Sequence, residues 1–194
     1  MLRAHAIALG LAALATGCVA PYTVKRQVRP NPFPGQASFA LLPLDFTTAE
    51  VQVDALPETP WTAKEKRQFE AAKVRMNVAF TREVLADLTR AGIRIAPAGS
   101  PTASDARFVI QPRVVEITPG DFSGMGKPSS HVRVNVAIAT RGGQVLDVVE
   151  VEHGTLGDPL AGDTEARLAI DGSFVGERLA GYVHERVVPG SELE

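Results

Sequence analysis

Hydrophobic and polar residues along the chain follow two periods, one typical of strands and one typical of helices. Positions 131–140 carry valine or isoleucine at every second residue, which predicts a strand with one buried face. Over 63–91 a helix with one apolar stripe is predicted. Thr62 stands three residues before Glu65, a capping-box spacing that predicts where this helix begins. The stripe consists of large residues at steps of four and seven: Phe69, Met76, Phe80, Val84 and Leu88.

Shorter apolar runs predict three more strands, at 38–46, 93–95 and 106–117. We expect Pro43 to end the first ladder and Pro112 to lie at an edge or bulge of the third, because proline has no N–H to donate. A helix between two short strands favours a βαβ crossover with a parallel pair. A last helical pattern covers 163–188, where Gly172 and Ser173 leave one helix or two as alternatives.

Gly142 and Gly143 predict a hairpin turn after the alternating strand. Ile138 would then face Asp147, a mismatch that predicts a bulge. The rest of the register pairs charge with charge and valine with valine: Arg133 with Glu152, Asn135 with Glu150, Val134 with Val151, and Val136 with Val149. The predicted fold class is α/β (α+β), with two layers: a mixed four- to five-stranded sheet and two main helices packed on it.

Charge and cysteine content exclude several classes of protein. The 194 residues hold 20 Lys plus Arg and 22 Asp plus Glu, a formal net charge of −2, so nucleic acid is not an expected partner. A single cysteine excludes an internal disulfide and a cysteine-based zinc site. It leaves open a thiol that serves as an attachment point.

The amino-terminal stretch is typical of a secretory signal peptide. Arg3 is followed by an apolar run over 6–15 and then by small residues up to Cys18; such a run is too short to span a bilayer. The residues Ala15-Thr16-Gly17-Cys18 resemble the lipobox of bacterial lipoproteins. The resemblance implies cleavage before Cys18 and acyl chains, such as palmitate, on that residue. The alternative is a plain signal peptide followed by a free, buried cysteine.

These features divide the chain into 1–17, a signal peptide; 18–36, a lipidated Pro-rich tether; and 37–189, a single α/β domain. Four prolines and three basic residues between positions 19 and 35 favour a spacer over a part of the core. If the lipobox resemblance holds, the membrane is one partner, through the lipid anchor on Cys18. Val19 after the cysteine favours the outer membrane, with the domain facing the periplasm.

The candidate chemical side chains do not converge on a catalytic, cofactor or metal site. Glu150 and Glu152 share one face of the predicted strand while His153 points to the other, so they predict a solvated polar face and not a set of metal ligands. Asp45 ends the first strand, a place where α/β enzymes carry carboxylates, but no base or metal cluster accompanies it. We therefore expect no enzyme activity and no cofactor.

The connection over 119–130 is the best candidate contact with a partner. It is rich in Gly, Pro and Ser and too long for a tight turn, and such loops are exposed and often functional. Phe122 and Met125 are its large apolar residues. We predict that these two residues anchor a partner. The alternative is that Phe122 folds back over the sheet edge.

Three segments carry a family resemblance: FALLPLDF at 39–46, VLADLTRAGIRIA at 84–96 and SDARFVIQPRVVEI at 104–117. With a hairpin and a closing helix they resemble a group of envelope lipoprotein domains. The group includes the periplasmic domain of the curli-secretion lipoprotein, the amino-terminal domain of the Tol-Pal propeller protein, and auxiliary lipoproteins of ABC-type transport systems. The resemblance implies a non-enzymatic interaction or accessory component of an envelope assembly, with an envelope protein as partner. The alternative is a lipid-binding transport auxiliary with an acyl chain as ligand.

Overall fold

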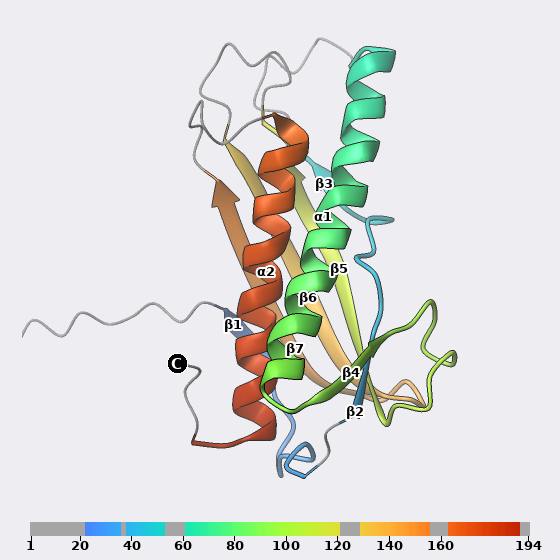
Figure 1. Ribbon diagram of the computed structural model, residues 1–194, viewed down its shortest axis with the longest axis vertical. Coiled ribbons are helices and arrows are strands. Elements are labelled where there is room, and N and C mark those ends of the chain that lie inside the picture. The colour runs from blue at the N-terminus through green and yellow to red at the C-terminus, as the bar shows by residue number, and fades with distance from the viewer. Residues whose placement is uncertain (1–21, 36–37, 53–60, 121–128, 156–162, 191–194) are drawn as a thin grey trace, which may run out of the picture.

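The computed structural model describes residues 22–35, 38–52, 61–120, 129–155 and 163–190. Two long helices, α1 (Ala63–Arg90) and α2 (Thr164–Val187), lie side by side on one face of a seven-stranded sheet (Figure 1). The predicted two-layer α+β class is confirmed. The predicted count of four to five strands is wrong, because two short strands outside the strong apolar runs also join the sheet.

The sheet is mixed, with the order β1-β7-β6-β5-β2-β4, and β3 pairs with β5 beside this path. Neighbours from β1 to β5 are antiparallel, whereas β2 runs parallel to both β4 and β5. The chain passes from β2 through the short β3 and α1 to β4, which is parallel to β2, so the predicted crossover with a parallel pair is confirmed. The strands are β1 (Thr23–Arg26), β2 (Ser38–Leu41), β3 (Glu50–Val51), β4 (Arg94–Pro97), β5 (Phe108–Thr118), β6 (Ser130–Thr140) and β7 (Val145–Thr155).

The β6–β7 hairpin has the predicted register. All four predicted pairs lie opposite each other, and the mismatch of Ile138 with Asp147 sits beside a register shift. In β5 the bulge lies between Val114 and Glu116 and not at Pro112. Pro112 is tolerated inside β5. Its carbonyl accepts a hydrogen bond from Asp45 N at 3.0 Å, and the pairing of β2 with β5 ends before Pro112, so β2 offers no partner that would need its missing N–H.

The predicted stripe of α1 faces the sheet, and all five of its residues are buried. Thr62 and Glu65 form the capping box, and the helix ends before Gly92, whose φ of +74° suits a glycine. On α2, Gly172 is buried inside one continuous helix, so the alternative of a break does not apply. A Cβ on Gly172 would lie 2.5 Å from Met76 O; the glycine allows close approach of the helices.

Residues 22–35 differ from the expected spacer, because they pack against the domain. β1 adds to the edge of β7, and Phe33 is fully buried with its ring centroid 5.0 Å from that of Phe108. Val28 N donates to Asp147 Oδ1 at 2.9 Å. The Pro-rich composition gave no indication that Phe33 is buried or that the backbone N–H of Val28 pairs with the buried carboxylate of Asp147.

Candidate functional site

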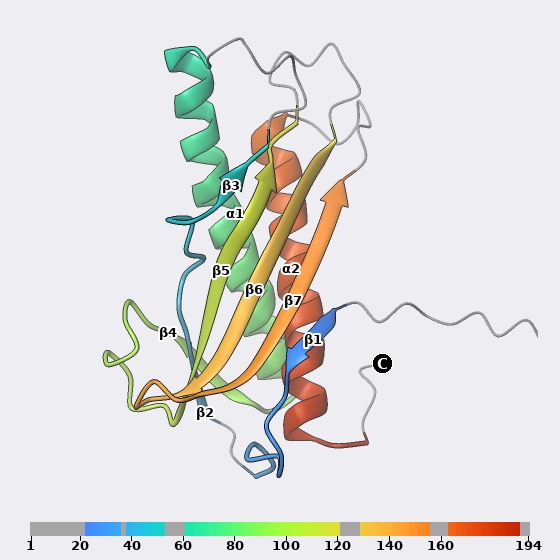
Figure 2. The ribbon, with the colours of Figure 1, turned by 180° about the vertical axis from the view of Figure 1, so that it is seen from behind.

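The face of the sheet opposite the helices is open and hollowed. Figure 2 shows that α1 and α2 both lie on the far side of the sheet from it. The hollow has a volume of about 670 Å³ and lies between β5–β7, the chain after β2, and the loop that carries Pro101. Its apolar surface comes mainly from Leu42, Pro43, Val115, Ala137, Val145 and Val148, and its polar groups from Asp45, Thr48, Gln111, Arg113 and Asn135.

Asp45 and Arg113 form a charged pair at the hollow, with Arg113 Nε 3.4 Å from Asp45 Oδ2. Thr47 donates to Asp45 Oδ1 through its Oγ1 at 2.6 Å and its backbone N at 2.9 Å. These hydrogen bonds, followed by the attraction of Arg113, lower the pKa of Asp45. The sequence placed Asp45 at a strand end; the structure places it in the hollow as an ionised rim group with no catalytic partner among the described residues.

Asn135 gives the hollow an unused hydrogen-bond acceptor. Its Oδ1 is buried and has no hydrogen-bond partner among the described residues. Buried polar atoms in proteins are almost always paired, so this oxygen is suited to a donor that enters the hollow from outside. A backbone or side-chain N–H of a bound segment would supply it.

A row of charged side chains borders the hollow on the same face of the sheet, on the side where Arg133 and Glu116 lie. Arg133 donates to Glu116, and His131 Nδ1 lies 3.8 Å from the Oε1 of Glu116. His131 Nε2 lies 4.0 Å from Glu152 Oε2. The open face therefore has an apolar hollow with a charged border, the arrangement of an interface core and its polar rim.

A second polar cluster lies between the sheet and α2. The fully buried carboxylate of Asp171 accepts from Ser130 Oγ at 2.5 Å and from Thr155 Oγ1 at 2.6 Å, and His153 Nδ1 lies 2.8 Å from it. His153 also stacks on the half-exposed Phe174, with ring centroids 4.3 Å apart. Both hydroxyls and the imidazole share the carboxylate of Asp171, so the cluster joins α2 to β6 and β7.

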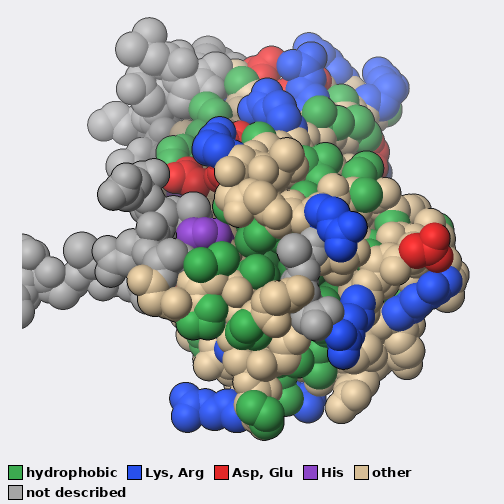
Figure 3. All heavy atoms as spheres, turned by 60° about the horizontal axis from the view of Figure 1, so that its bottom comes forward, with side chains coloured by type: hydrophobic (Ala, Val, Ile, Leu, Met, Phe, Trp, Pro, Cys, Tyr) green, Lys and Arg blue, Asp and Glu red, His purple; other side chains and the backbone are tan. Residues whose placement is uncertain are grey.

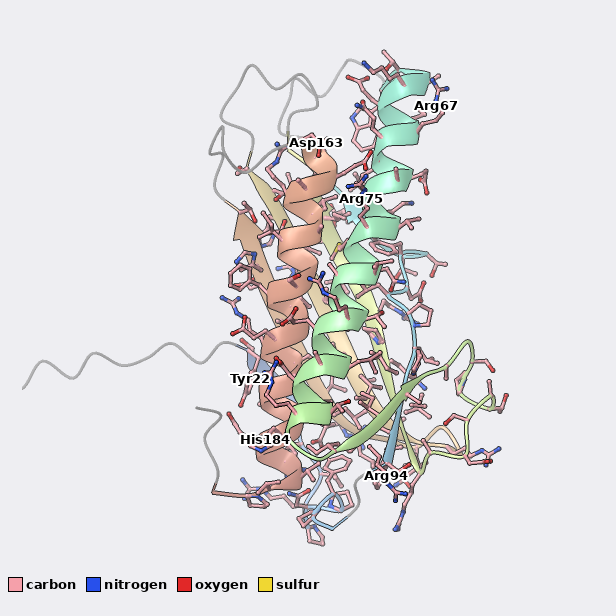
Figure 4. The ribbon with its side chains drawn as sticks, in the orientation of Figure 1. Tyr22, Arg67, Arg75, Arg94, Asp163 and His184 are labelled. Carbon is pink, nitrogen blue, oxygen red and sulfur yellow. The ribbon has the colours of Figure 1, made fainter. Side chains whose placement is uncertain are left out.

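The structure separates the three histidines of the described chain. His131 lies on the open face, His153 points to α2 as the alternation predicted, and His184 is buried on α2 with no partner for Nδ1 among the described residues (Figure 4). No group of three or more His, Cys, Asp or Glu within the described ranges could hold a metal ion. Cys18, Phe122 and Met125 lie outside those ranges, so their predicted roles stay predictions.

The hydrophobic pattern did not predict the hollow, although one signal was available. His131, Arg133 and Asn135 form a polar row on the outward face of β6, and Ala137 and Ala139 interrupt that row. A contiguous apolar patch on an outward face is a sign that something covers or occupies it. The hollow itself depends on a loop distant in the sequence, so the alternation could not locate it.

No family model matches the sequence, and no curated protein matches it. Solved structures with a similar fold include the PelC dodecamer from Paraburkholderia phytofirmans, at 16% identity and a TM-score of 0.43 over 81% of this chain and 96% of that one. The hypothetical protein CT253 from Chlamydia trachomatis aligns at 15% identity and a TM-score of 0.39 over 75% and 96%. A neuraminyllactose-binding hemagglutinin homolog from Helicobacter pylori aligns at 8% identity and 0.41 over 84% and 91%. Alignments at this level assign no functional residue.

Proposed function

We propose that this chain is a membrane-anchored bacterial lipoprotein of the outer membrane that acts, without catalysis, as an interaction component of an envelope assembly. The anchor is Cys18, and the contact with an envelope protein is the hollow of the open sheet face. The hollow is the observation that carries the proposal. It exposes apolar side chains beside an unpartnered acceptor on Asn135, within a charged border.

The described polar groups support a binding role over an enzymatic one. A hydrolase of the serine type needs a hydroxyl bonded to a base, and no described hydroxyl is hydrogen-bonded to a histidine. The ionised Asp45 lies at the hollow with a cation and a threonine only. In the part of the chain that the structure describes, neither helix has the combination of length and hydropathy that a membrane span requires.

The alternative of a lipid carrier has less support. A carrier would hold an acyl chain between the sheet and the helices. The side chains of Phe80, Val134 and Leu179 in that layer are fully buried, and the helices approach so closely that Gly176 leaves no room for a Cβ, which would lie 2.8 Å from Phe80 O. The hollow described above is on the other face of the sheet.

Photo-crosslinking in intact envelopes tests this proposal. Benzoylphenylalanine in place of Thr48, an exposed residue of the hollow, should give a discrete protein adduct, and the same group in place of the exposed Val78 on α1 should not. Ala137→Arg fills the hollow and should remove the adduct, whereas Val78→Arg should not. Thermal unfolding of each variant establishes that it folds.

Two results would contradict the proposed contact at the hollow. Equal adducts at positions 48 and 78 would show that the hollow is not a specific contact. An undiminished adduct in folded Ala137→Arg would show that the partner does not enter it. For the anchor, Cys18→Ser should lose palmitate labelling and leave the membrane fraction; a variant that keeps both would contradict the lipoprotein assignment.

A further inference from the structure

The packing of Tyr22 limits how far the domain can lie from a lipid on Cys18. Tyr22 OH donates to Glu185 Oε2 at 2.5 Å, and its ring packs edge-on against Tyr182 at 5.1 Å. From Cys18 to Tyr22 the chain advances by 22 − 18 = 4 residues. Even fully extended, this connector spans at most about 14 Å. A lipid anchor therefore holds the neighbourhood of Tyr22 against the membrane surface.

The exposed charged side chains between Tyr22 and Arg29 are basic. Residues 22–35 contain three basic residues and no acidic residue. Lys25, Arg26 and Arg29 are all exposed. Lys25 Nζ lies 2.9 Å from Glu150 Oε1, but Arg26 and Arg29 form no ion pair with another described residue. Two free guanidinium groups near a lipid attachment point suit an anionic headgroup layer, to which each cation contributes roughly a fivefold gain in affinity.

Other surfaces of the domain fit such a layer less well. The opposite edge of the sheet, β4, is five strand spacings from β1, about 24 Å. That distance exceeds the Debye length of about 8 Å at physiological salt, so charges on β4 do not sense a surface that β1 touches. On α2, Glu177 and Glu185 are exposed and acidic, and an anionic surface repels them. Because Glu185 accepts from Tyr22 OH, its charge offsets part of the attraction that Arg26 and Arg29 provide.

We propose that the edge formed by β1 and the chain up to Arg29, the basic edge, rests on an anionic phospholipid surface. The inference depends on the proposed lipid anchor at Cys18. In this orientation the sheet stands edge-on to the membrane, and its open face points along the bilayer. The hollow then stays accessible to a neighbouring envelope protein. Viewed from its lower end, the domain shows Lys and Arg side chains spread among apolar ones (Figure 3), so charge alone would not select one orientation without the short connector.

Energy transfer to the membrane tests the orientation in the full-length lipidated chain. A donor dye is attached at Gln27→Cys on the basic edge or, as the matched control, at Ala96→Cys on β4; both positions are exposed. The acceptor is a headgroup-labelled lipid in phosphatidylglycerol–phosphatidylethanolamine vesicles. Transfer from position 27 is expected to exceed transfer from position 96, because the latter lies farther from the headgroups.

Charge reversal tests the basis of the contact. In Arg26→Glu/Arg29→Glu the difference between the two donors should shrink, although the short connector still keeps Tyr22 near the headgroups. The control reverses two charges at Arg67 and Arg94, which lie away from Tyr22 (Figure 4), and should keep the difference. Equal transfer from both positions in the unmodified chain, or greater transfer from position 96, would overturn the inference. So would identical behaviour of the two charge-reversal variants.

The results also distinguish this inference from the proposed function. If Cys18→Ser remains in the vesicle fraction, the anchor is wrong and both proposals fail. If the chain is anchored and crosslinks through position 48 but the donors transfer equally, only the orientation fails. If the orientation holds and no adduct forms at position 48, only the proposed partner surface fails.

Discussion

At the scale of single residues, Asp147 is mismatched with Ile138 in its strand pair, but its carboxylate joins α2 and the amino-terminal segment to β7. Its carboxylate is fully buried and accepts from Tyr182 OH at 2.6 Å and from Arg186 Nε at 2.8 Å. Val28 N completes the set from the amino-terminal segment. A buried charge with these partners is well satisfied, and removal of the Arg186 guanidinium would leave the carboxylate charge uncompensated at a cost of about 3–5 kcal/mol.

The tyrosine in this cluster predicts a loss of stability at alkaline pH. Burial, and then the hydrogen bond to Asp147, raise the pKa of Tyr182. The folded state thus holds the phenolic proton more tightly than the unfolded state, whose tyrosine pKa is about 10. This stabilisation is complete below about pH 10 and is lost as the pH rises further. Denaturant unfolding from pH 8 to 11 should show the decline, and Tyr182→Phe should show a shallower one.

Tyr22 sets a background for this measurement, because burial and Glu185 raise its pKa as well. The comparison is therefore between slopes and not between absolute stabilities. Tyr182→Phe also lowers stability near neutral pH by about 1 kcal/mol, through the lost hydrogen bond. An unchanged alkaline slope in Tyr182→Phe would contradict the assigned coupling.

At the scale of elements, the two helices depend on glycine at their closest approach. A Cβ on Gly172 would lie 2.5 Å from Met76 O, and one on Gly176 would lie 2.8 Å from Phe80 O. Glycine inside a helix costs about 1 kcal/mol relative to alanine, so its presence here is explained by packing. The helices can sit side by side on the sheet and bury their stripes only if these positions lack side chains.

Gly172→Ala should therefore destabilise the protein despite the better helix propensity of alanine. The added methyl group must push α1 and α2 apart, and overpacking of this kind costs about 1–3 kcal/mol. The neighbouring Ser173 lies in the outer groove between the helices, and Ser173→Ala should change the free energy of unfolding by no more than about 0.5 kcal/mol. A stability gain in Gly172→Ala, measured by urea unfolding, would contradict the close approach.

At the scale of the whole molecule, the domain includes chain that composition assigned to a spacer. Asn31 Nδ2 donates to Arg186 O at 2.8 Å, and the guanidinium of Arg186 lies 5.1 Å from the ring centroid of Phe33. Phe33 itself packs with Phe39 and Phe108. The amino-terminal segment thereby joins the end of α2 to β2 and β5, and the connector to Cys18 becomes short.

This placement predicts that the segment contributes to global stability. Phe33→Ala should lower the free energy of unfolding by about 3–5 kcal/mol, the cost of removing a buried aromatic side chain. Val24 on β1 is 43% exposed, and Val24→Ala provides the matched control, with a change within about 0.5 kcal/mol. An effect of Phe33→Ala as small as that of the control would indicate a spacer after all.

The sequence by itself determined those features that depend on neighbours within a few residues. The capping box at Thr62, the stripe of α1 and the turn at Gly143 are local, because a helix or hairpin repeats its contacts at fixed short spacing. The register of β6 and β7 followed from that turn and from the match of valines and charges. The signal pattern that ends at Cys18 is also a property of sequence alone, and its predicted lipidation rests there.

Only the tertiary structure decided the features that join distant segments. Phe33 gains its burial from Phe39, Phe108 and Arg186, and no period in 22–35 contains that information. The hollow forms where Pro101 and the chain around Asp45 meet three strands. The alternating pattern of β6 therefore placed Asn135 on the outward face but did not indicate that its Oδ1 is buried. Close packing at Gly172 and the partners of Asp171 likewise depend on how α2 meets its neighbours. Local patterns specify elements, whereas a site is formed by long-range contacts that pattern alone leaves open.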